Sequence, residues 1–222
     1  KTEHVGTPSD QYGPGCLNNQ GTAEVKGGTF KSVNRRTYAI VSTGDMTVSN
    51  AIVSGAHGGI ASDAGTLVIE SGRFSSTEYY GLYVSNDGTG TDTQKAAVTV
   101  KGGTFTGKQY SVWIGSDINN PVNSTIDIQD GVFENPLNAQ NNTRENAIVV
   151  NGGIFKGSVT EYVSDTATAA TLTSGSDTLY YVGTPAVVSE RLSVVAKSGD
   201  IVTVIQGDAD FSLAEGVTVD NS

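Results

Sequence analysis

The sequence predicts an all-β chain, in which residues 1–160 form a right-handed parallel β-helix and residues 161–222 form a C-terminal β-rich extension. Three observations predict this fold. A Gly-Gly-x-Phe-like segment recurs along the chain, alternating apolar and polar residues precede each copy, and 28 of the 222 residues are glycine. Alternation with a period of two is typical of a strand with one buried face, and tight corners favour glycine.

Six segments share one frame and give the chain its repeat. Their last residues are Phe30, Val53, Phe74, Phe105, Phe133 and Phe155. The steps between them are 23, 21, 31, 28 and 22 residues, so the coil has about 22 residues, a length typical of the right-handed type. The two long steps contain the polar stretches 86–94 and 116–123, which we interpret as loops on the same side of the stack. Stacked phenylalanines are predicted to form an internal ladder.

Two kinds of strand are predicted in each coil. The first precedes the Gly-Gly corner and carries an inward apolar pair, namely Ala23/Val25, Met46/Val48, Leu67/Ile69, Val98/Val100, Ile126/Ile128 and Ile148/Val150. The second lies at 39–42, 59–62, 82–85 and 112–115. Leucine-rich repeats need Leu at fixed spacing and helical repeats need a period of 3.6, and both patterns are missing.

The repeat ends after Phe155. Strands are predicted at 178–182, 200–205, 210–213 and 216–219, with a short amphipathic helix at 188–197 that Gly199 ends. No element is predicted for the Ser/Thr/Ala-rich stretch that follows Val163.

These features resemble a known group: pectin-lyase-like right-handed parallel β-helix modules of large extracellular proteins of gut anaerobic bacteria. The resemblance is carried by the Gly-Gly-x-Phe coils, by Gly-Ser-Val-Thr-Glu-Tyr-Val at 157–163 and by Ala-Lys-Ser-Gly-Asp-Ile-Val-Thr-Val-Ile at 196–205. It implies an adhesin-like bacterial protein that is extracellular or attached to the cell surface. In that group the helix and the Gly-Asp-x-Val-Thr strand open a β-helix, whereas here they come last. Either a further module follows Ser222, or the final strands cap or flank the first.

The composition of the chain argues against some classes of binding partner. The formal net charge of −10 disfavours nucleic acid and anionic lipid, because both attract basic surfaces. Cys16 is the single cysteine, so no internal disulfide can form. No apolar run is long enough to insert in a membrane. The chain begins at Lys1 without Met, which suggests a processed or trimmed chain, and in that case the evidence on targeting has been removed. The sequence leaves the oligomeric state open.

Catalytic signatures are sparse. Pectin hydrolases of this fold resemble one another in four motifs: an Asn-Thr-Asp run, an Asp-Asp pair, a Gly-His-Gly and an Arg-Ile-Lys. This chain has only a partial match to the third, Ala56-His57-Gly58. Glycoside hydrolysis needs two placed carboxylates, and no Asp-Asp pair occurs. A lyase would need a Lys or Arg base, and the candidates are Arg73, Lys95, Lys101 and Lys108. They are scattered over different turns of the repeat.

Acidic residues follow the second strands at Asp63, Asp87, Asp92 and Asp117. Oxygen-rich loops can bind Ca²⁺, but the spacing matches no calcium-binding motif. We therefore interpret them as turn residues and predict no cofactor, with calcium as the alternative.

Aromatic residues suggest a binding face on the second strand. When these strands are aligned on Ile40, Ile60, Tyr83 and Trp113, alternation predicts that this column points outward. The column three residues earlier contains Thr37, His57, Tyr80 and Tyr110. Sugar rings pack on flat aromatic faces. We predict a glycan-binding strip, whose candidate contact residues are His57, Tyr80, Tyr83, Tyr110 and Trp113. The alternative is that the C-terminal third or a second subunit buries this strip.

The predicted function is a non-catalytic extracellular module that binds a polysaccharide or a host or cell-surface glycan. A polysaccharide lyase or hydrolase of the same fold and a passive structural spacer are the alternatives.

Overall fold

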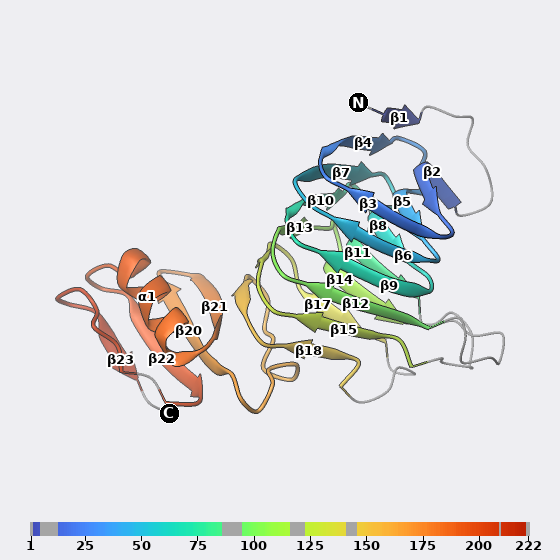
Figure 1. The fold of residues 1–222 in the computed structure, drawn as a ribbon. Coiled ribbons are helices and arrows are strands. Elements are labelled where there is room, and N and C mark those ends of the chain that lie inside the picture. Colours follow the sequence, from blue (N-terminus) through green and yellow to red (C-terminus); the bar gives the residue numbers. More distant parts are fainter. Residues whose placement is uncertain are drawn as a thin grey trace.

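The computed structural model describes residues 2–4, 13–85, 95–115, 123–140, 146–208 and 210–220. Short strands from successive turns of the chain build three sheets, which we name A, B and C (Figure 1). From β3 to β15 the chain visits the sheets in the order C, A, B, so that consecutive strands of one sheet are three elements apart. The described pairings among β1 to β19 are all parallel. The prediction of an all-β chain with stacked parallel strands is confirmed.

The strands of each sheet are given in spatial order. Sheet A contains β1 (Thr2–His4), β4 (Gly28–Ser32), β7 (Ala51–Gly55), β10 (Gly72–Ser76), β13 (Thr104–Thr106), β16 (Val132–Phe133), β19 (Gly153–Phe155), β21 (Asp177–Gly183), β20 (Thr168–Ser174), β22 (Ile201–Gln206) and β23 (Thr218–Asp220). Sheet B contains β17 (Leu137–Ala139), β14 (Tyr110–Gly115), β11 (Tyr80–Ser85), β8 (Gly58–Ser62), β5 (Thr37–Ser42) and β2 (Gly13–Asn19). Sheet C contains β18 (Ile148–Val150), β15 (Thr125–Ile128), β12 (Ala96–Val100), β9 (Gly65–Ile69), β6 (Asp45–Val48) and β3 (Thr22–Val25).

Sheet C follows the predicted alternation. In β9, Leu67 and Ile69 are fully buried while Val68 between them is partly exposed. Leu67 pairs with Val98 of β12, so the inward rows continue from coil to coil. Each coil therefore contributes one apolar pair to a continuous core, because the pleat turns alternate side chains to the same side.

Sheet A carries the predicted phenylalanine ladder. Phe74, Phe105, Phe133 and Phe155 occupy equivalent positions and are at most 1% exposed. Their successive ring centroids are 5.0, 5.0 and 4.7 Å apart, with planes within 11°. Phe30 is partly exposed, because Val53 separates it from the stacked rings.

The corners that lead into sheet A need a left-handed backbone. Gly72 has φ 137°, and a Cβ there would lie 2.6 Å from the carbonyl oxygen of Ala51 in the preceding coil. In that preceding coil Asn50 takes a left-handed conformation with φ 52°. Asparagine tolerates this conformation better than most other non-glycine residues. Asn50 takes the place of Gly27 in the first coil, whereas the counterpart of Gly72 is Ala51.

The C-terminal extension continues sheet A with a change of direction. β21 pairs antiparallel with β19 and with β20, β22 pairs antiparallel with β20, and β23 is parallel to β22. Helix α1 (Pro185–Val195) packs on this part of the sheet through Val188 and Leu192 (Figure 1). No described helix is long and apolar enough to cross a membrane.

Several elements of the extension differ from the prediction. The helix begins at Pro185 rather than near residue 188, because Thr184 caps it and proline is well tolerated in the first turn. The strand predicted at 210–213 does not form, and Phe211 and Leu213 instead pack as an irregular segment against the core under α1. β20 was not predicted, since its Thr-Ala-Ala-Thr sequence carries little hydrophobic signal.

Candidate functional site

The predicted aromatic columns form on the outward face of sheet B. In the register of β11 and β14, Tyr80 pairs with Tyr110 and Tyr83 pairs with Trp113. The Tyr83 and Trp113 rings stack with centroids 5.1 Å apart and planes 13° apart. Tyr80 stacks on Trp113 at 5.2 Å and on Tyr110 at 6.4 Å. The structure thus brings together four of the five predicted contact residues in one stacked group.

Three more rings join this group. His57 lies 4.4 Å from Tyr79 and 5.0 Å from Tyr38, and Tyr38 lies 5.2 Å from Tyr83. Tyr79 in turn contacts Tyr80 at 5.6 Å. We call the complete set the aromatic strip: Tyr38, His57, Tyr79, Tyr80, Tyr83, Tyr110 and Trp113.

Tyr38 and Tyr79 were missed by the sequence prediction. Tyr38 is the residue after Thr37, which the alignment placed in the column. Tyr79 lies in the connection between β10 and β11. Only the clustering of tyrosines at 79, 80 and 83 could have indicated its role.

The predicted outward positions of Ile40 and Ile60 are wrong. Both are 0% exposed, and Ile40 pairs with Ile60, which pairs with the inward Leu82. The outward column instead runs through Val41 and Ala61 to Tyr83. The reason is that all residues of β5 and β8 are buried, so no alternation in the sequence shows which of two adjacent apolar residues faces the core.

The predicted column of His57 is also shifted by one residue. The partner of Tyr80 in β8 is Gly58, and the partner of Gly58 in β5 is Tyr38. A Cβ at Gly58 would overlap the Tyr38 ring, so this glycine makes room for that ring. Gly58 and the small Ala61 let Tyr38 reach the aromatic groups of the next coil. His57, just before β8, contacts the strip from the corner.

Exposure divides the aromatic strip into two parts. Tyr38, His57 and Trp113 are 7%, 8% and 9% exposed, so they are covered. The remaining members are partly exposed: Tyr79, Tyr80, Tyr83 and Tyr110. Tyr38, Val41 and Ala61 form a small apolar cluster of their own, against which Tyr80 and Tyr83 pack. The predicted strip is therefore a packed aromatic layer that presents tyrosines, while its single indole is largely inaccessible.

Burial also sets the charge state of His57. Removal of the ring from water lowers its pKa from 6.5 to about 4, and the charge of Glu78 and a backbone hydrogen bond involving Arg35 only partly oppose this. The imidazole is uncharged at neutral pH and acts as one of the packed rings. A covered, neutral ring of this kind does not fit the role of a catalytic acid.

The basic residues considered for a lyase are spread over the stack. Arg73 lies in β10 of sheet A, whereas Lys95 and Lys101 lie at opposite ends of β12 in sheet C. Lys108 lies between β13 and β14. Lys101 Nζ also donates to Glu70 Oε1 at 3.0 Å. These residues do not converge on one site.

No cluster of three or more metal-ligating side chains occurs within the described ranges. The backbone amide of Asp63 donates to the carbonyl of Ser42 at 2.8 Å. The other calcium candidates, Asp87, Asp92 and Asp117, lie outside the described residues, as do 86–94 and 116–122. The prediction that these two stretches leave the same side therefore stays a prediction.

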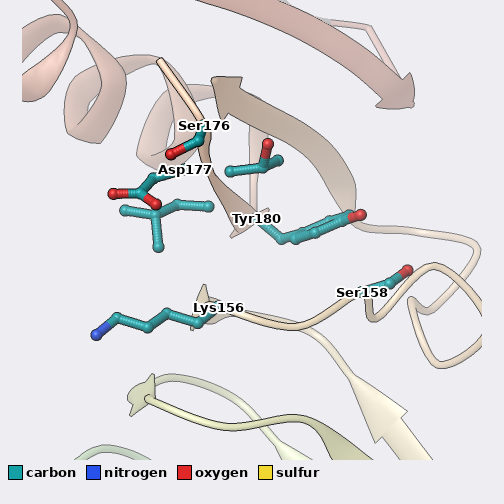
Figure 2. Close-up of a pocket in the computed structure, with 7 residues that line it drawn as sticks. Lys156, Ser158, Ser176, Asp177 and Tyr180 are labelled. Atoms are coloured by element: carbon teal, nitrogen blue, oxygen red, sulfur yellow. The ribbon is translucent and has the colours of Figure 1, made fainter. Parts of the chain in front are cut away.

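A second candidate site is a cavity of about 630 Å³ between the end of β19 and β21 (Figure 2). Its lining residues are Lys156, Ser158, Ser176, Asp177, Thr178, Leu179 and Tyr180. Figure 2 shows Lys156 and Ser158 on one wall, with Asp177 and Tyr180 on the other. Sequence reasoning gave no signal for this cavity, because its walls come from segments that no repeat relates.

The cavity exists because two paired strands separate. The pairing of β19 with β21 ends at Phe155 and Tyr180, although β21 continues to Asp177. Beyond Phe155, the amide of Lys156 donates to the carbonyl of Phe133 at 3.0 Å. Gly157 then packs so closely on Pro136 that a Cβ would lie 2.9 Å from its Cα. The chain is thereby drawn toward the preceding coil and away from β21.

Comparison of the chain with protein families, with curated proteins and with solved structures finds no match.

Proposed function

We propose that this chain is a right-handed parallel β-helix module that binds carbohydrate without catalysis, through the aromatic strip on sheet B. The fold proposal is supported by the parallel register of three sheets that the chain visits in turn. Parallel strands of one sheet that are joined by a crossover are right-handed in about 98% of cases. The last strands and α1 then form the extension that flanks the end of the stack.

The observation that carries the binding proposal is the set of partly exposed tyrosines held against covered rings. Tyr80 stacks on Trp113 with planes 20° apart, and Tyr83 stacks on the same indole at 13°. Rings fixed in this way lose little further freedom when a ligand binds. Tyrosine adds apolar ring surface and a hydroxyl that can donate and accept, which suits the faces and hydroxyls of a sugar.

The net charge of the chain and the resemblance of its coils suggest which class of molecule it binds. A net charge of −10 disfavours nucleic acid and anionic membranes. The Gly-Gly-x-Phe coils resemble modules of bacterial surface proteins, so the proposed partner is a polysaccharide or a host or cell-surface glycan met outside the cell. Each site would be weak, since an aromatic contact contributes about 1 kcal/mol beyond burial. Many copies on a surface would strengthen attachment through avidity.

A glycan array with the wild-type chain and the Tyr80→Ala/Tyr110→Ala double variant tests this proposal. We expect saccharide hits for the wild type that the double variant loses. The matched control is Ile52→Ala, since Ile52 is 51% exposed on the outward face of sheet A and far from the strip in the coil. Equal binding by all three proteins, or no hit for any, would contradict the proposal.

A passive spacer is the second candidate, and one observation favours it. Trp113 is only 9% exposed, so the largest ring of the strip is already covered without a ligand. In that case the aromatic strip would serve as an outer packing layer that stiffens sheet B. The Tyr80→Ala/Tyr110→Ala variant would then lower stability, and the array would show no saccharide hit for the wild type.

A further inference from the structure

The cavity between β19 and β21 combines an exposed strand edge with polar side chains. The hairpin between β20 and β21 has a two-residue turn, in which Gly175 has φ 62° and Ser174 pairs with Asp177. The residues that flank such a turn bond to each other, so the backbone of the next residue, Thr178, faces the opposite way. On that side lies the cavity, because the chain at Gly157 has moved away from β21.

We propose that this cavity is a second carbohydrate site, which takes a short neutral saccharide and is independent of the aromatic strip. Its volume of about 630 Å³ falls within the range of roughly 300–1,000 Å³ that is usual for small-ligand pockets. Tyr180 offers a partly exposed ring, and Asp177 offers an exposed carboxylate that can accept two hydroxyls. Ser158 and Ser176 add hydroxyls from the two walls (Figure 2).

The charges at the cavity favour a neutral ligand. The ammonium of Lys156 is ion-paired with Glu134, so its charge is already balanced. Asp177 then leaves the wall with a net negative charge. A uronic acid would meet repulsion from Asp177, whereas a neutral sugar can donate its hydroxyls to the same carboxylate.

The length of the open edge favours a saccharide over a peptide strand. Strand addition gains its affinity from a ladder of main-chain hydrogen bonds. Beyond the last pair with β19, only 177–179 of β21 remain without a strand on that side. Alternation leaves Thr178 as the one residue of these three whose backbone faces the cavity. One residue cannot support a ladder, but it can add one donor and one acceptor to a site that the side chains define.

Amide chemical shifts of the whole chain, followed by NMR during titration, test the proposal. The probes are neutral disaccharides of glucose, galactose and mannose, with digalacturonate and trialanine as the charged and peptide comparisons. We expect saturable shifts at Lys156, Ser158, Asp177 and Thr178 with at least one neutral disaccharide. Asp177→Asn should weaken this binding about tenfold, because a charged acceptor is lost. The control is Asp165→Asn, an exposed aspartate that does not line the cavity.

The outcome separates this site from the aromatic strip. The Tyr80→Ala/Tyr110→Ala variant should keep the cavity shifts, whatever becomes of the shifts in sheet B. The inference is overturned if no neutral disaccharide shifts the cavity amides, if digalacturonate or trialanine binds there more tightly, or if Asp177→Asn and Asp165→Asn behave alike. Failure of the strip alone would leave the cavity shifts intact.

Discussion

Arg191 donates through Nη2 to both carboxylate oxygens of Asp130, at 2.8 and 2.9 Å. Arg191 lies on α1, and Asp130 lies at the corner before β16, in the repeat. The amide of Gly131 also donates to Asp130 Oδ1 at 2.7 Å, which orients the carboxylate. The extension is therefore attached to the stack by the β19–β21 ladder, by the bridge between Val150 and Val163, by packing of Ala169 and Val182 in the common core, and by this ion pair.

Asp130→Asn should loosen this attachment. The loss of one charge weakens this charge-assisted pair, and a partly exposed pair of this kind contributes about 1 kcal/mol. We expect faster hydrogen exchange in β20 to β22 and unchanged exchange in β10 to β13. Glu70→Gln, which removes the more exposed pair with Lys101, is the matched control. Exchange in β20 to β22 that matches the wild type would show that this ion pair does not help to hold the extension.

The phenylalanine ladder should dominate the stability of the stack. Phe105 is fully buried between two stacked rings, so Phe105→Ala should lower the free energy of unfolding by about 3–5 kcal/mol. Phe30→Ala should cost clearly less, because Phe30 is partly exposed and lies outside the stacked rings. Denaturant unfolding of both variants gives the comparison. Equal losses would contradict a role for stacking between coils.

Trp113 is the only tryptophan and gives a specific fluorescence signal. Because its side chain is 9% exposed, its emission should be blue-shifted and poorly quenched by acrylamide in the free protein. Tyr83→Ala removes one of the two tyrosine rings that stack on it and should increase quenching. Full quenching in the wild type would mean that the indole is accessible, which would contradict the packed aromatic layer.

His57 should make stability fall in mild acid. Its pKa is lowered to about 4 in the folded state from 6.5, so below pH 6.5 the unfolded state binds a proton that the folded state does not. This contribution is fully present above pH 6.5 and is lost as the pH falls toward 4, by at most about 3 kcal/mol. Unfolding of the wild type and His57→Gln at pH 7 and pH 4.5 isolates it. The variant should lose less stability between the two pH values, and parallel losses would refute the assignment.

The sequence predicted the parts of the fold in which apolar and polar residues alternate or in which one residue type recurs from coil to coil. Alternation in sheet C and the recurrence of Phe74 and Phe105 follow from one buried face and one repeated position. The register of sheet B was missed by one residue at Ile60. All residues of β8 are buried, so apolar and polar residues do not alternate there. The cavity at Asp177 was not predictable, since it depends on where the chain leaves β19, and that is set by contacts with Pro136 in another coil.

The binding proposal requires that the partly exposed tyrosines of the aromatic strip contact sugar. The most direct measurement is titration calorimetry of the wild type, Tyr80→Ala, Tyr110→Ala and Ile52→Ala with the tightest saccharide whose array signal the Tyr80→Ala/Tyr110→Ala variant loses. We expect each tyrosine variant to raise the Kd about fivefold, which corresponds to about 1 kcal/mol of aromatic contact, and Ile52→Ala to leave the Kd unchanged. Unchanged affinity in both tyrosine variants would contradict the claim.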